Sequence, residues 1–172
     1  MLHIPLIQYF ECQEKVIPEL IQILEFISGQ IVKEKQEVAL ISEGISHSFD
    51  RTGDIYLDFS SFTKESPGLH QLYFEIQKAL KYQQGITLDK GHTSTAFAPK
   101  INLMQHADLP LTVFQSAIVF ASSVIEELSV PDHTKAWQLV LLRYKSDAAG
   151  EDWSQGLWAN DLSWNLMASY SI

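Results

Sequence analysis

Two short segments about a hundred residues apart, 2–7 and 99–104, alternate apolar and polar side chains in the manner of half-buried β-strands. Successive side chains of a strand point to opposite faces, so residues two apart share a face. His3 and Lys100 are the cationic or titratable residues of the two segments, and Asn102 lies two residues after Lys100. We expect the segments to lie side by side as strands, with His3 and Lys100 directed into one cleft that suits a phosphate group.

Apolar residues recur at three- and four-residue spacing in three further segments, which predicts amphipathic helices over 14–28, 68–83 and 111–128. Gly29 follows the first of these segments at a position typical of a helix end. The residues expected on the buried side of the third helix are Val113, Phe114, Ala117, Ile118, Ala121, Val124, Ile125 and Leu128.

The remaining segments predict strands, a turn and loops. Strands are expected over 2–10, 37–45, 54–59, 97–104, 137–144 and 162–171, with a turn over 46–53 and polar loops over 89–94 and 147–161. This order favours an α+β fold of antiparallel sheets with helices on the outer faces. We expect a single domain, 1–172, with two pseudo-symmetric lobes formed by residues 1–60 and 97–172 and joined by the helix 68–83.

Composition restricts the protein class. With 172 residues, 46% of them hydrophobic, the chain is long enough for one well-buried core. No apolar run approaches the roughly 18 residues that a transmembrane helix needs, and the N-terminus does not resemble a secretory signal, so we expect a cytoplasmic protein. The single cysteine, Cys12, excludes an internal disulfide and a cysteine-based zinc site. We expect no metal and no cofactor, because the histidines lack the helical i, i+4 spacing of zinc enzymes.

The net charge of −9 bears on the kind of ligand. Proteins that bind long nucleic acids need a basic stripe to displace counterions from the phosphates, and this chain has none. A nucleic-acid ligand is therefore expected to be a nucleotide or a strand end in a small pocket. An acidic loop with Trp153 and Trp158, and the neighbouring Trp137 and Trp164, is expected to supply core and loop-anchoring aromatics rather than a base-stacking platform.

The order of the predicted elements and the two alternating segments resemble the two-histidine phosphoesterase superfamily, which includes 2′-5′ RNA ligase-like proteins and cyclic phosphodiesterases. That family carries two His-x-Thr/Ser-Leu motifs on strands of two similar lobes. Here the matching segments are His3-Ile4-Pro5-Leu6 and Lys100-Ile101-Asn102-Leu103, the second preceded by Phe97-Ala98-Pro99. The resemblance covers nearly the whole chain, but the first motif lies at the N-terminus, so we expect the strand and helix that usually precede it to be missing or replaced.

The motif residues depart from the family pattern. Lys100 replaces the second histidine, and Pro5 and Asn102 replace the two hydroxyl residues, so only His3 of the four chemical positions is retained. In the family one imidazole acts as base and the other as acid, and both tasks suit a group that titrates near neutrality. A lysine, with an ordinary pKa of about 10.4, neutralises a phosphate more readily than it moves a proton. His92, in the loop before the second motif, is a candidate auxiliary.

Two alternatives stay open. In a different register of the resemblance, His47-Ser48-Phe49 would be the first motif, which makes His47 a second candidate ligand-binding residue beside Asn102. For function, we expect a protein that binds a small phosphorylated ligand (a nucleotide, a cyclic phosphate or an RNA end) with weak or lost phosphodiesterase activity. The alternative is a non-enzymatic module that retains the fold, has lost the site and binds a protein partner.

Overall fold

The computed structural model describes residues 3–7, 10–60, 68–88, 97–147 and 161–172. The helices are η1 (Glu14–Val16), α1 (Ile17–Glu34), α2 (Gly68–Lys81) and α3 (Leu111–Glu127). The strands are β1 (Phe10–Cys12), β2 (Ala39–Ile41), β3 (Gly44–Phe49), β4 (Gly53–Asp58), β5 (Ile86–Leu88), β6 (Lys100–Ala107), β7 (His133–Lys135), β8 (Gln138–Lys145) and β9 (Ser163–Ser171). The protein is thus of mixed α+β class, as predicted.

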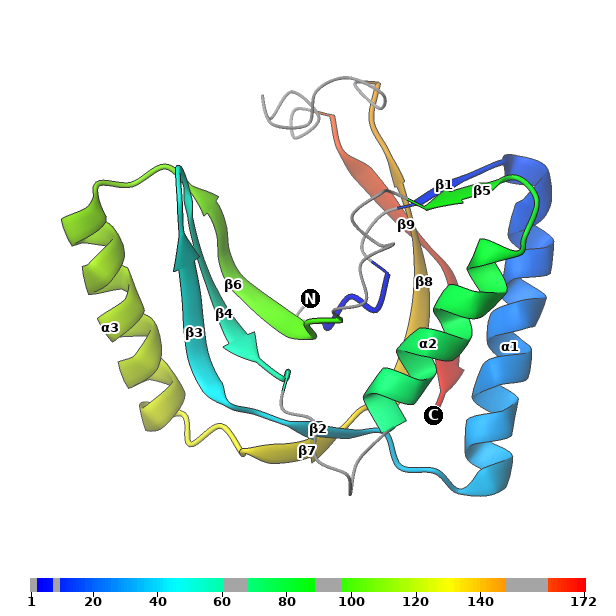
Figure 1. Ribbon diagram of the computed structural model, residues 1–172, viewed down its shortest axis with the longest axis horizontal. Coiled ribbons are helices and arrows are strands. Elements are labelled where there is room, and N and C mark those ends of the chain that lie inside the picture. The colour runs from blue at the N-terminus through cyan, green and yellow to red at the C-terminus, as the bar shows by residue number, and fades with distance from the viewer. Residues whose placement is uncertain (1–2, 8–9, 61–67, 89–96, 148–160) are drawn as a thin grey trace.

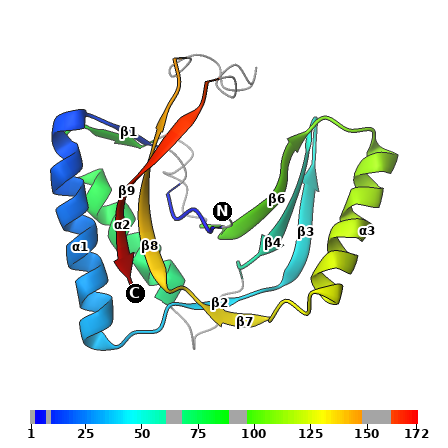
Figure 2. The ribbon, with the colours of Figure 1, turned by 180° about the vertical axis from the view of Figure 1, so that it is seen from behind.

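The described strands form four small antiparallel sheets: β1 with β5, β2 with β7, β8 with β9, and the three-stranded sheet β3–β4–β6. Helices α1 and α2 cover one side of β8–β9, and α3 covers one side of β3–β4–β6 (Figure 1). The faces of these two sheets that none of the described helices covers (the uncovered faces) are turned toward each other, and the β2–β7 ribbon joins the two halves at one end (Figures 1 and 2). We call the uncovered face of β3–β4–β6 the inner face.

The two spatial halves are not the two sequence halves. The expected division into lobes 1–60 and 97–172 is wrong, because β4 from the first range pairs with β6 from the second. Likewise α1 packs against β9, and the Tyr170 hydroxyl donates a hydrogen bond to the carbonyl oxygen of Ile21 at 3.0 Å. Antiparallel partners and helix neighbours are chosen by burial rather than by closeness in sequence. The halves are also unequal: of the described helices, η1, α1 and α2 lie in one half and α3 in the other (Figure 1).

The larger core lies between α1, α2 and β8. Its buried residues follow the helical spacing that the sequence shows: Leu20, Leu24, Ile27 and Ile31 in α1, and Leu69, Leu72, Ile76 and Leu80 in α2, with Leu139 from β8. Burying each such side chain stabilises the fold by about 1.5–3 kcal/mol. The stripes therefore fix which side of each helix faces β8.

Helix α1 is longer than predicted. Gly29 does not end it, and the helix continues to Glu34. Ile31 extends the buried stripe of Ile27 by one more turn, so burial outweighs the roughly 1 kcal/mol that a mid-helix glycine costs. The helix ends instead at Lys35, whose backbone adopts the left-handed conformation at φ 51° and whose N–H donates to the last-turn carbonyls.

Two other predictions near the N-terminus are wrong. The described part of the expected strand 2–10 is irregular from residue 3 to residue 7, and β1 begins only at Phe10. Ile4, Leu6 and Ile7 all pack against the larger core, so the segment buries three apolar side chains instead of alternating as a strand. The expected turn 46–53 is also mostly strand, because β3 continues to Phe49 before the chain reverses.

The predictions with the strongest periodicity are confirmed. Helices α2 and α3, and strands β8 and β9, lie within a few residues of their expected bounds. In α3, however, Phe114 is the one fully buried residue, while Val113 and Leu128 are exposed. No helix within the described ranges combines the length and the apolar character that a membrane crossing requires.

Candidate functional site

The inner face of β3–β4–β6 gathers polar side chains from all three strands. Lys100 and Asn102 of β6 lie opposite Asp58 and Tyr56 of β4, and Tyr56 in turn lies opposite Ser46 of β3. The β4 side chains that alternate with Tyr56 and Asp58, those of Ile55 and Leu57, are buried on the side of α3. Strand alternation therefore separates an apolar side, packed on the helix, from a polar inner face. The expectation that Lys100 and Asn102 share a face is confirmed.

The cation of Lys100 lies over an aromatic ring rather than beside a carboxylate. Its Nζ is 4.5 Å from the centroid of the Tyr56 ring. The nearest carboxylate in the register, that of Asp58, accepts hydrogen bonds from the Ser60 N–H at 2.8 Å and the Ser46 hydroxyl at 3.4 Å. Within the described ranges no carboxylate lies within ion-pair distance of Lys100. The ammonium group thus keeps its charge available for an anion while the ring orients it.

Asn102 brings a second unusual feature to the same face. Its side-chain oxygen, Oδ1, is buried and meets no hydrogen-bond donor among the residues that the structure describes. A buried acceptor without a donor costs about 1–3 kcal/mol. Residues two apart in a strand are separated by about 6.6 Å. The inner face therefore offers a cation and, one side-chain spacing away, an acceptor that lacks a donor.

We expect Asn102→Val to raise the free energy of unfolding by about 1 kcal/mol, because valine removes the unpaired acceptor and suits a strand. Urea denaturation of both proteins without ligand measures the change. The matched control is Asn165→Val, since Asn165 lies in β9 and is exposed, and it should leave stability within about 0.5 kcal/mol. A destabilised Asn102→Val protein would show that Oδ1 has a donor in solution.

One of the predicted histidines lies away from Lys100 and Asn102. His47 packs edge-on to Phe114 of α3, with ring centroids 6.2 Å apart, and so lies on the side of the sheet opposite the inner face. His3 is exposed and precedes the N-terminal segment that packs on the larger core. His92 lies outside the described residues. Of the five predicted site residues, the structure brings Lys100 and Asn102 together and separates His47 from them.

Tyr56 is the functional candidate that the sequence reasoning missed. Its signal was available, because Tyr56 and Asp58 alternate with the apolar residues Ile55 and Leu57. In a strand this pattern directs the polar residues away from the buried side. What the sequence did not show was that β6 would be the neighbour of β4, which alone places the Tyr56 ring beneath Lys100.

The uncovered face of β8–β9 is aromatic and apolar. Leu139 and Leu141 pack on the helix-covered core, so strand alternation directs Leu142 and Tyr144 away from it. The register shift between Leu141 and Leu142 leaves one extra residue in β9, after which Trp164 pairs with Tyr144, so both lie on the face that looks toward the inner face. Trp164 is 58% exposed and Trp137 68% exposed, so the expectation of core aromatics is wrong for both. Trp153 and Trp158 lie outside the described residues.

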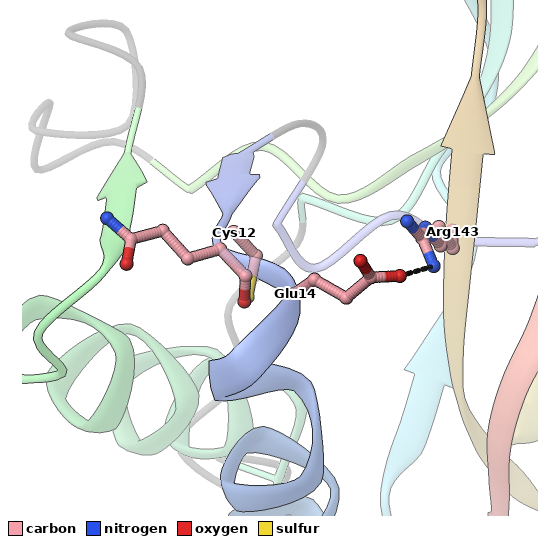
Figure 3. A network of polar contacts seen from close by, with 4 residues as sticks. Cys12, Glu14 and Arg143 are labelled. Carbon is pink, nitrogen blue, oxygen red and sulfur yellow. Dashed lines mark hydrogen bonds and ion pairs between the residues drawn. The ribbon is translucent and has the colours of Figure 1, made fainter.

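A separate polar cluster lies on the helix-covered side of β8. The Arg143 guanidinium reaches from β8 to Glu14 of η1, with Nη1 and Oε1 3.2 Å apart (Figure 3). Burial raises the pKa of the nearby Cys12 thiol, and the positive charge of Arg143 partly opposes that rise. The Glu14 carboxylate is exposed, and such ion pairs contribute at most about 1 kcal/mol. The cluster ties η1 to β8 and takes no part in the inner face.

The described ends of the acidic loop close the β8–β9 hairpin. The Asp161 carboxylate accepts hydrogen bonds from the Asp147 N–H at 2.6 Å and the Ser146 hydroxyl at 2.7 Å. These bonds, the backbone one first, hold the pKa of Asp161 below its usual range. Glu151 and Asp152 lie outside the described residues. No group of three metal-binding side chains occurs in the parts of the chain that are described.

Three comparisons with known proteins identify no relative of this chain. No protein-family model matches the chain, and neither a curated protein nor a solved structure does.

Proposed function

We propose that the inner face of β3–β4–β6 binds a small phosphorylated ligand, and that the fold is a 2′-5′ RNA ligase-like one. The observation that carries this proposal is the position of Lys100, whose ammonium group lies over Tyr56 without a carboxylate partner among the described residues. A chain with a net charge of −9 repels free anions, so a phosphate needs such a local cation to be held. The two facing sheets with helices outside agree with the proposed fold.

The ligand class follows from Asn102. The phosphoryl group of a monoester dianion or of a phosphodiester has no hydrogen to donate, so by itself it leaves the buried Oδ1 unsatisfied. A sugar hydroxyl or a base N–H of the same ligand donates to that oxygen, which favours a nucleotide, a cyclic nucleotide or an RNA end. The aromatic surface of Tyr144 and Trp164 on the facing sheet suits stacking of a base.

We expect hydrolysis at this face to be weak or absent. Phosphodiester cleavage needs a base and an acid that titrate near neutrality, and a lysine side chain is ordinarily a poor base at that pH unless it is strongly desolvated. His47 lies on the opposite side of the sheet, and His3 is the one remaining histidine that the described N-terminal segment can supply. Incubation with 2′,3′-cyclic nucleotides and 2′-5′-linked dinucleotides tests this expectation. Turnover that is lost in His3→Ala would show that the expectation is wrong and that His3 is catalytic.

Replacement of Lys100 by glutamine should weaken binding of a nucleoside monophosphate at least tenfold, because the site loses its only proposed cation. Isothermal titration calorimetry measures the affinity. Lys78→Gln is the matched control, because Lys78 is exposed on α2 and its substitution removes one positive charge away from the inner face. An equal loss of affinity in both variants would mean that only the net charge of the protein matters. Unchanged affinity in Lys100→Gln would mean that the ligand binds elsewhere.

A second candidate function is binding of a protein partner by a non-enzymatic module. The apolar residues that are exposed on the uncovered β8–β9 face favour it. Leu166 is 55% exposed there, beside Trp164. A pull-down from cell extract distinguishes the two functions. A stoichiometric partner that is lost in Trp164→Ala, together with no thermal shift from any nucleotide, would replace the phosphate-binding proposal.

A further inference from the structure

The solvent side of α3 carries an uncharged, partly apolar surface that its own sheet does not use. We call it the α3 outer face and define it by Val113, Ser116, Val119, Phe120 and Ser123, all exposed. Val119 is 70% and Phe120 69% exposed. The 15 residues from Leu111 to Ile125 include no charged side chain, in a protein of net charge −9. This face is therefore where two like-charged copies approach with the least repulsion.

The α3 outer face is self-complementary in shape. In an antiparallel pair of α3 helices, one register sets Phe120 against Ser116 of the other copy and, at the same time, Val113 against Ser123. Each large side chain then meets a small one, and the twofold axis repeats both contacts. The serines suit this role because their hydroxyls already donate within the helix, Ser116 to Thr112 at 3.0 Å and Ser123 to Phe120 at 2.8 Å. No unpaired hydroxyl would be buried between the copies.

We infer that α3 forms a symmetric, antiparallel homodimer interface through its outer face. The surface is independent of the proposed phosphate site, because α3 lies on the opposite side of β3–β4–β6 from the inner face. A pair of single helices buries less than the roughly 800 Å² per partner of a standard interface. The expected dimer is therefore weak, with a dissociation constant on the order of 10 μM.

Sedimentation equilibrium of the full chain from about 1 to about 500 μM measures the association. Wild type should dimerise, and Phe120→Glu should raise the dissociation constant at least tenfold. Phe26→Glu is the matched control, because Phe26 is 67% exposed on α1 and its substitution adds the same negative charge on another helix. Thermal melting should show both variants folded, since both side chains are exposed. A wild-type chain that stays monomeric, or a dimer that Phe120→Glu leaves unchanged, overturns the inference.

Cross-linking tests the antiparallel register in the same protein. In a Cys12→Ser background, the double variant Val113→Cys with Ser123→Cys should form covalent dimers on mild oxidation, whereas each single variant should not. Parallel helices would instead align each position with itself, so dimers from a single variant overturn the antiparallel arrangement.

Discussion

Phe114→Ala is expected to lower the free energy of unfolding by about 3–5 kcal/mol, the usual cost of removing a fully buried phenylalanine. Phe114 is 1% exposed and is the one fully buried residue of α3. Its ring lies 4.9 Å from that of Phe49, centroid to centroid, and packs over Gly53. Phe114 is therefore the most deeply buried contact of α3 with β3–β4–β6. Chemical denaturation measures the change.

Phe26→Ala is the control for this experiment, because Phe26 is exposed on α1 and should change stability by less than about 1 kcal/mol. Similar losses in the two variants would mean that α3 does not rest on Phe114. A separate unfolding transition of α3 in Phe114→Ala would support the same packing, because this half of the protein would then open before the larger core.

Gly53→Ala should destabilise the protein by about 3 kcal/mol, since a methyl group there overlaps the Phe114 ring. The ring cannot move aside cheaply because it is fully buried. Gly29→Ala is the matched control: nothing lies within 4 Å of the added methyl group, and Gly29 is inside α1. That change should stabilise the protein by about 0.5–1 kcal/mol.

A double-mutant cycle decides whether the two residues act on each other. In the Phe114→Ala background the clash is gone, so Gly53→Ala should cost less than about 1 kcal/mol. The resulting coupling of roughly 2 kcal/mol would assign the effect to the Gly53–Phe114 contact. If Gly53→Ala costs the same in both backgrounds, the strain lies in the β4 backbone instead.

These tests bear on the proposed functions because Gly53 and Phe114 position the strand that carries Tyr56. The glycine lets the ring approach β4 closely, which supports Ile55 and Leu57 from the helix side. Tyr56 and Asp58 then project to the other side, where Lys100 lies. The core contact and the polar inner face are thus two consequences of one strand alternation.

The sequence predicted one part of the site correctly and two parts wrongly. The strand period of residues 100–104 correctly placed Lys100 and Asn102 on one face, because that period depends only on local geometry. The expected neighbour of this strand, the segment containing His3, instead buries Ile4, Leu6 and Ile7 without forming a strand. His47 was expected in a turn and lies in β3 facing α3. In both cases the outcome depended on which distant surface was available for burial.

By itself, the sequence determined the features that arise from periodicity: α2 and α3, strands β8 and β9, and the antiparallel α+β class. Only the tertiary structure decided that α1 passes Gly29, that β4 pairs with β6, and that Tyr56 lies beneath Lys100. The physical reason is that helices and strand faces follow from local geometry, whereas strand partners are chosen by the burial of surfaces far apart in the chain.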